Sequence, residues 1–229
     1  MRVNKILSKF SPIIILAMIS TAFSFSQNNK IEKVFTSKSE KKINYAYSLP
    51  QNFDSAKDYN VLIAPGGGTS DDSDDFILWR NCKNNFDWIL LETNATFGNS
   101  INTLKEFLDY LNENLHVIEN KFHIMGFSAN SADTFNVALN LPNYFHSVTG
   151  VPGHPRTNNK SDLIKLRNME VNFIVGENDT YWLNAAEKYN TMLKELSIEV
   201  KLNIVKNSNH KLTSIVGDRF IDYMSWLKD

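Results

Sequence analysis

One serine, one acid and one histidine of this chain each follow a predicted strand and could together form a nucleophilic site. Ser128 lies in the stretch GFSAN, Asp179 in GENDTYW and His210 in KNSNHKL. A serine hydroxyl becomes a good nucleophile when a neighbouring base takes its proton, and histidine is well suited to do so near neutral pH. A carboxylate can then hold the histidine in one tautomer. These residue types predict acyl transfer, with Ser128 as nucleophile, His210 as base and Asp179 as orienting acid.

Each of these residues also has a plainer interpretation. Taken alone, Ser128 is better explained as a residue that caps a helix, and Asp179 could cap the helix that begins near Tyr181. Glu177 is a second acid in the same loop and could replace Asp179 or be an ordinary surface acid. Ser131 is a rival nucleophile, but it lacks a glycine two positions earlier and would lie inside the helix.

Three consecutive glycines follow a predicted buried strand in the stretch PGGGTS, residues 65–70. Glycine allows positive φ, so the N–H groups of such a loop can point into a cleft. The stretch lacks the lysine of a phosphate-binding P-loop and the glycine spacing of a dinucleotide fingerprint. An acyl-transfer enzyme needs N–H groups around a developing oxyanion. Gly67, Gly68 and Ala129 are therefore the candidate donors, and a flexible turn is the alternative.

Aromatic residues beside the proposed nucleophile and acid are candidates for substrate binding. Phe127 precedes the serine, and Tyr181 and Trp182 follow the acid. They could line an acyl or an alcohol site, although Trp182 also begins an amphipathic helix and could belong to the core. His154, in PGHPR, is a further candidate contact on a loop after a strand. The acidic stretch TSDDSDDF lacks the glycine and final glutamate of an EF-hand loop, so no metal site is expected.

The elements that must position these residues alternate along the chain. Apolar alternation over 31–36 and 43–49 predicts an antiparallel hairpin. Strands are then predicted in YNVLIAPGGG, FDWILLET, KFHIMGF, FHSVTGVPG, EVNFIVGENDT and IEVKLNIVKNSNH. Helices are predicted over 74–83 and in INTLKEFLDYLNENL, ADTFNVALNLP, WLNAAEKYNTMLKEL and TSIVGDRFIDYMSWL. This order predicts a mostly parallel sheet with helices on both faces, and ligands bind beyond the carboxyl ends of such strands.

Serine, acid and histidine in this order, each after a successive strand, match the nucleophile-elbow pattern. From Ile31 onward the chain resembles the α/β-hydrolases, in particular the small secreted serine esterases of the feruloyl-esterase-like and dienelactone-hydrolase-like branch. Two positions differ from the family pattern. Asn130 replaces the glycine that usually ends the elbow, which predicts a wider helix–strand crossing or an altered turn, and Pro65 replaces a histidine found in many relatives.

The resemblance implies a serine carboxylic ester hydrolase that works through an acyl-enzyme and needs no cofactor. No long insertion lies between VTGVPG and VNFIVG, where larger relatives carry a lid. We therefore expect an open cleft that takes small-molecule or polymer-attached esters. A peptidase or amidase of the same fold, and a catalytically silent binding protein, are the alternatives.

Composition indicates one globular domain over 27–229. The full chain has 229 residues, of which 42% are apolar and 21% charged, as in ordinary soluble domains. Its net charge of -1 predicts no general attraction for nucleic acid or anionic lipid. Cys82 is the single cysteine, so no intramolecular disulfide can form. It is expected to be a half-buried helix residue, with a nucleophilic role as the alternative.

The start of the chain has the pattern of a secretory signal peptide over 1–26. A basic beginning precedes an apolar run over 12–25, shorter than a bilayer span requires. Ser24 and Ser26 are the small residues expected before a cleavage at Gln27. The pattern predicts export to the periplasm or the extracellular space without a stable membrane anchor. An uncleaved anchor is the alternative.

Overall fold

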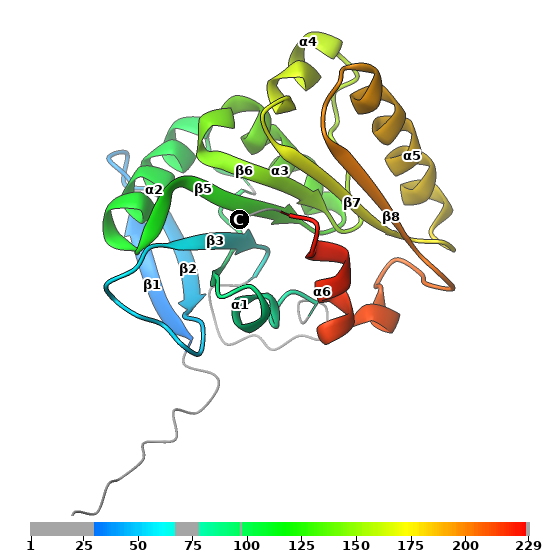
Figure 1. Ribbon diagram of the computed structural model, residues 1–229. Helices are drawn as coiled ribbons and strands as arrows, with labels where there is room; N and C mark the ends of the chain where they lie inside the picture. The colour runs from blue at the N-terminus through cyan, green and yellow to red at the C-terminus, as the bar shows by residue number, and fades with distance from the viewer. Residues whose placement is uncertain (1–29, 67–77, 97, 228–229) are drawn as a thin grey trace, which may run out of the picture.

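The computed structural model describes residues 30–66, 78–96 and 98–227 (Figure 1). The predicted signal peptide, Gly67 and Gly68 lie outside these residues. The described strands form one sheet in the order β1-β2-β4-β3-β5-β6-β7-β8. They are β1 (Ile31–Thr36), β2 (Lys42–Ser48), β3 (Tyr59–Ala64), β4 (Ile89–Thr93), β5 (Val117–Gly126), β6 (Phe145–Gly150), β7 (Glu170–Gly176) and β8 (Val200–Val205).

The pairing of the strands confirms the predicted hairpin and the mostly parallel sheet. β1 pairs antiparallel with β2, β2 pairs antiparallel with β4, and β3 to β8 run parallel to one another. Every residue of β3, β4 and β7 is buried, as expected for strands covered on both faces. β1 and β8, at the two edges, are more exposed.

Successive side chains of the central strands belong to two different cores. Val61 and Ile63 of β3 join a core with α2 (Ile101–Asn114), α3 (Ala129–Asn140) and α5 (Thr180–Glu195). Leu62 and Ala64 join a core with α1 (Cys82–Asn85) and α6 (Asp218–Met224). Because side chains alternate across a strand, these helices cover opposite faces of the sheet, and Figure 1 shows α1 and α6 on one side.

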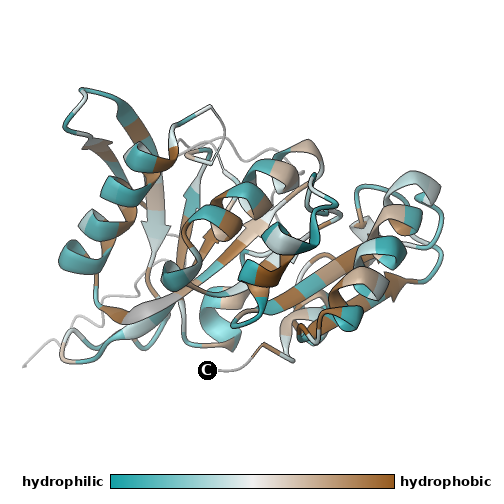
Figure 2. Cartoon of the chain, turned by 90° about the horizontal axis from the view of Figure 1, so that it is seen from above, coloured by the Kyte–Doolittle hydropathy of each residue, from teal (hydrophilic) through white to brown (hydrophobic). Residues whose placement is uncertain are grey.

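The covering helices are amphipathic. Figure 2 shows them banded in hydrophilic and hydrophobic colours, whereas the central strands are mainly hydrophobic. In α2, for example, Leu104, Phe107, Leu108 and Leu111 are buried, which is the predicted helical spacing. Among the helices of the described residues, none combines the length and the apolar composition needed to cross a membrane.

Two predicted helices differ from the structure. Of the helix expected over 74–83, residues 74–77 lie outside the described part, 78–81 form a turn, and helix begins only at Cys82. The single closing helix is also wrong: a 3-10 turn at Thr213–Ile215 is followed by α6. Gly217 separates the two with φ 83°, a left-handed conformation that interrupts a right-handed helix.

The connection between β6 and β7 is short. It holds only α4 (Lys160–Leu163) and a 3-10 turn at Ile164–Leu166. No large insertion lies between β6 and β7. Because β5 to β8 are parallel, the loops that follow these strands lie at the same edge of the sheet.

Candidate active site

Ser128 forms a sharp turn between β5 and α3. Its φ of 54° and ψ of -131° are unusual for a residue with a Cβ, and such strained residues concentrate at functional sites. The turn is held by the Ser128 N–H, which donates to the Pro152 carbonyl at 2.9 Å, and by the Ser131 N–H, which donates to the Ser128 carbonyl at 3.0 Å. Ser128 occupies the N-cap position of α3, but its side chain makes no capping hydrogen bond.

Gly126 allows β5 and α3 to approach closely below this turn. A Cβ at residue 126 would meet the Ser131 Cα and would lie 2.6 Å from the Thr134 Oγ1. Asn130, which replaces the usual elbow glycine, accepts hydrogen bonds at its Oδ1 from the Thr96 Oγ1 at 2.9 Å and from the Thr134 Oγ1 at 3.4 Å. The asparagine side chain therefore links α3 to the loop after β4, and the close approach of α3 to β5 is made at Gly126.

Gly126→Ala is expected to lower the free energy of unfolding by about 1–3 kcal/mol, because the added methyl group would push against the backbone of α3. Chemical denaturation measures this loss. Gly98→Ala shows the cost of backbone strain without a clash, since Gly98 has φ 74° with open space around its Cα. It should lose only the roughly 1–2 kcal/mol of a left-handed alanine. A harmless Gly126→Ala would contradict the close contact.

The structure brings Ser128, His210 and Asp179 together. The His210 Nε2 lies 2.8 Å from the Ser128 Oγ, and the His210 Nδ1 lies 2.7 Å from the Asp179 Oδ2. A carboxylate only accepts hydrogen bonds, so the Nδ1 carries a proton, and the neutral imidazole then accepts the serine hydroxyl proton at Nε2. The Asp179 side chain is 12% exposed and that of His210 37%. Asp179 makes no side-chain cap to α5.

The loops after β7 and β8 are joined by backbone hydrogen bonds, which sets the Asp179–His210 distance. The Glu177 N–H donates to the Val205 carbonyl, and the Asn178 N–H donates to the Ser208 carbonyl, both at 2.9 Å. A Cβ on Gly176 would meet the Ser208 carbonyl oxygen, so glycine is needed for this approach. The sequence offered no signal for this contact, since the two loops are far apart along the chain.

Glu177 contacts the β8 loop and not His210. Its carboxylate accepts hydrogen bonds from the Asn207 N–H and the Lys206 Nζ, both at 2.9 Å. These donors, the backbone N–H first, hold the pKa of Glu177 below its ordinary value. Of the two acids in this loop, Asp179 is thus the one hydrogen-bonded to the imidazole.

The rival nucleophiles are buried. Ser131 is inaccessible, and its Oγ donates a hydrogen bond to the Ser128 carbonyl at 2.6 Å. Cys82 was expected to be half-buried but is completely buried, and desolvation raises the pKa of its thiol to about 12. A buried thiol that stays protonated is a poor nucleophile, so neither residue competes with Ser128.

The predicted oxyanion donors are described only in part. Ala129 is the first residue of α3, directly after Ser128. Gly67 and Gly68 lie outside the described residues. Gly66, just before them, is buried, and a Cβ there would lie 2.6 Å from the Glu92 Cβ. The loop therefore leaves β3 tightly packed against β4.

Of the three predicted substrate-binding residues, Phe127 and Trp182 lie beside the imidazole of His210, and Tyr181 lies beside Trp182. The rings of Phe127 and Trp182 lie 5.6 and 5.8 Å from the His210 ring. The Tyr181 ring is 5.4 Å from that of Trp182. His154 joins this group, with its ring 5.2 Å from Trp182.

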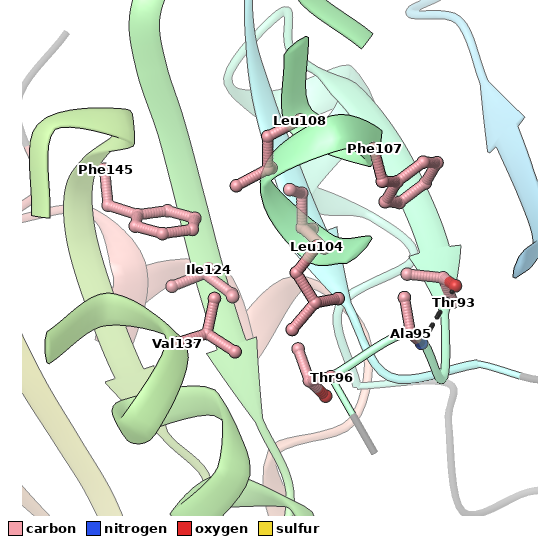
Figure 3. A pocket seen from close by; sticks show the side chains of 10 residues that line it. Thr93, Ala95, Thr96, Leu104, Phe107, Leu108, Ile124, Val137 and Phe145 are labelled. Atoms are coloured by element: carbon pink, nitrogen blue, oxygen red, sulfur yellow. Dashed lines mark hydrogen bonds between the residues drawn. The ribbon is translucent and has the colours of Figure 1, made fainter. Parts of the chain in front are cut away.

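A separate cavity between α2, α3 and β5 is too small to hold a substrate (Figure 3). Its volume is about 10 Å³, room for about one water molecule, and its walls are mainly apolar side chains such as Leu104, Ile124 and Val137. Within the described residues, the His, Cys, Asp and Glu side chains form no group of three that could hold a metal ion.

Comparison with known proteins reveals similarity in structure only. No protein-family model matches the chain, and no curated protein matches its sequence. A ferulic acid esterase from Anaeromyces mucronatus is similar over 85% of this chain and 88% of its own, with 15% identity and a TM-score of 0.67. A thermostable esterase is similar over 86% of this chain, with 14% identity and a TM-score of 0.63. The chain spans only 62% of that esterase.

A peptidase shares the same architecture. Dipeptidyl peptidase 4 from Porphyromonas gingivalis is similar over 88% of this chain, with 13% identity and a TM-score of 0.64. The chain spans only 35% of the peptidase. At these identities the likeness establishes the fold, so the chemistry has to be argued from the residues of the site.

Proposed function

Because the chain has the α/β-hydrolase fold, we propose that it is a serine hydrolase that cleaves carboxylic esters through an acyl-enzyme. One observation carries the proposal: the continuous hydrogen-bonded array from Ser128 through His210 to Asp179, at 2.8 and 2.7 Å. This array supplies a nucleophile, a base within reach of its proton and a group that orients the base.

In the proposed acylation step, the Ser128 Oγ attacks the ester carbonyl carbon while the His210 Nε2 takes the hydroxyl proton. Asp179 stabilises the imidazolium that forms. The carbonyl oxygen becomes an oxyanion, for which we propose the N–H groups of Ala129 and of Gly67 or Gly68 as donors. Collapse of the tetrahedral intermediate breaks the bond to the alcohol oxygen, and His210 gives its proton to that oxygen.

In the deacylation step, water takes the place of the alcohol. His210 removes a proton from the water, the resulting hydroxide attacks the acyl carbon, and the proton then returns to the Ser128 Oγ. The acid is released and the resting array is restored. The proposed steps use only protein groups and water.

Amide or peptide hydrolysis is the second candidate, because the same array could perform it and a dipeptidyl peptidase has the same fold. The relative lengths favour the ester. The chain covers 88% of the ferulic acid esterase but only 35% of the peptidase, so most of the peptidase has no counterpart here.

Labelling with a fluorophosphonate, combined with paired substrates, tests the proposal. The protein is expected to take up one phosphonyl group on Ser128, identified by peptide mass spectrometry, and to hydrolyse p-nitrophenyl acetate much faster than p-nitroacetanilide. Faster cleavage of the anilide would favour the amidase. Neither labelling nor turnover would favour a catalytically silent binding protein.

The exported form is also part of the proposal. We propose that residues 1–26 are removed and that 27–229 act as a single domain in the periplasm or outside the cell, on small-molecule or polymer-attached esters. The basic and apolar pattern of the first residues supports export. The short connection between β6 and β7 supports a site that is open to such substrates.

A further inference from the structure

Four aromatic side chains form a continuous cluster beside the Ser128–His210–Asp179 array, here called the aromatic wall: His154, Tyr181, Trp182 and Tyr189. The His154 ring lies 5.2 Å from both the Trp182 and the Tyr189 ring, and it is nearly parallel to Tyr189, at 14°. Tyr181 meets Trp182 edge to face at 5.4 Å. One residue comes from the loop after β6 and three from α5, so only the tertiary structure assembles the wall.

Two members of the aromatic wall, His154 and Tyr189, are held in place by hydrogen bonds. The His154 Nδ1 donates a hydrogen bond to the Pro155 carbonyl at 2.7 Å. The Tyr189 hydroxyl donates to the Asn158 Oδ1 at 3.0 Å, and this oxygen also accepts from the Lys188 Nζ at 2.9 Å. Tyr189 is buried. A rigid surface loses little conformational entropy when a ligand covers it.

The outer part of the wall is exposed without an evident structural reason. Tyr181 is 69% exposed, more than any other large apolar side chain of the described residues. The Trp182 side chain next to it is half-buried. An exposed aromatic surface that adjoins a proposed catalytic group is typical of a ligand contact, since flat rings offer large area at low entropic cost.

The position of the wall relative to His210 decides which part of an ester it meets. Trp182 lies against the His210 ring at 5.8 Å. In ester hydrolysis, the imidazole gives its proton to the oxygen of the departing alcohol. That oxygen must therefore come within hydrogen-bond distance of the His210 Nε2, and the group attached to it projects past the imidazole and its neighbours.

From this geometry, and resting on the proposed ester hydrolysis, we propose that the aromatic wall binds the alcohol portion of the substrate and selects alcohols that carry an aromatic ring. Such a ring can stack on Trp182 or meet Tyr181 edge to face. The acyl group then occupies the side of Ser128 that is away from the wall.

Three acetate and phenylacetate esters distinguish a contact of the aromatic wall with the alcohol portion from a contact with the acyl portion. Benzyl acetate carries its ring on the alcohol, ethyl phenylacetate carries it on the acyl group, and ethyl acetate has none. The value of kcat/KM covers binding and acylation, so it includes the alcohol contact. In Trp182→Ala and in Tyr181→Ala, the ratio of kcat/KM for benzyl acetate to that for ethyl acetate is expected to fall, by about tenfold in the former.

The ratio for ethyl phenylacetate to ethyl acetate is expected to change less than twofold in both variants. Val34→Ala is the control, since Val34 is an exposed apolar residue of β1, at the opposite edge of the sheet. It should leave both ratios as in the unchanged protein. If Trp182→Ala does not fold, Tyr181→Ala still tests the proposal, because the exposed tyrosine is not part of the core.

Two outcomes would overturn the proposal. A fall confined to ethyl phenylacetate would assign the wall to the acyl group, and equal losses for all three esters would make the wall a structural element only. Failure of the proposed function looks different, because an unchanged protein that neither hydrolyses ethyl acetate nor reacts with a fluorophosphonate would exclude the serine hydrolase itself.

Discussion

Replacing Ser128 by alanine is expected to lower kcat for p-nitrophenyl acetate by at least about 10⁴-fold and to abolish fluorophosphonate labelling. The substitution removes the hydroxyl group that lies 2.8 Å from the His210 Nε2, while the proposed oxyanion donors are left unchanged. The fold should be retained, because alanine and serine both carry a Cβ and are equally strained at φ 54°. Circular dichroism and thermal denaturation, run beside the kinetics, check this.

Ser131→Ala is the matched control for the nucleophile. Ser131 is buried and donates a hydrogen bond to the Ser128 carbonyl, so its loss should cost about 1 kcal/mol of stability. Labelling of Ser128 should persist in this variant. Labelling that survives in Ser128→Ala, or that disappears only in Ser131→Ala, would show that the nucleophile has been assigned to the wrong serine.

Replacing Asp179 by asparagine is expected to lower kcat by about 10⁴-fold, with little change in fold. The asparagine amide can donate to the His210 Nδ1, which moves the ring proton to Nε2. An Nε2 that carries a proton cannot accept one from Ser128. Steady-state kinetics with p-nitrophenyl acetate measures the loss, and the rate of fluorophosphonate labelling should fall in parallel, because labelling needs the same proton transfer.

Glu177→Gln distinguishes the two acids of this loop. The Glu177 carboxylate accepts hydrogen bonds from the Asn207 N–H and the Lys206 Nζ, both in the loop after β8. A glutamine keeps an acceptor for these donors, so we expect kcat to change less than about tenfold. A near-normal rate for Asp179→Asn together with a large loss for Glu177→Gln would assign the orienting role to Glu177.

The regular part of the fold was predictable because its signals are local. The apolar run of β3 and the spacing of leucines in α2 reflect one strand or one helix with its own buried face. Two helix predictions were wrong for the residues that the structure describes: the helix over 74–83 and the unbroken closing helix. In the latter, the break depends on the conformation of Gly217, and glycine tolerates both helical and left-handed backbone.

The effect of Asn130 shows the limit of motif comparison. A missing elbow glycine predicted a wider crossing or an altered turn. In the structure, the close contact between strand and helix is made by Gly126 against Ser131 and Thr134, and Asn130 bonds to Thr96. Which residue needs to be small depends on the direction of each Cβ at the crossing, and that direction is a property of the packed elements.

The sequence alone determined the residue types and their order: a serine, an acid and a histidine, each directly after a strand of a mostly parallel sheet. Parallel strands end at a common edge, so this order already placed the three on the same side of the molecule. Only the tertiary structure decided that Asp179 rather than Glu177 meets His210, that Ser131 is buried, and that His154 extends the aromatic surface. Those outcomes depend on differences of a few ångströms between segments far apart along the chain, such as Asp179 and His210, which are 31 residues apart, and no local pattern encodes such differences.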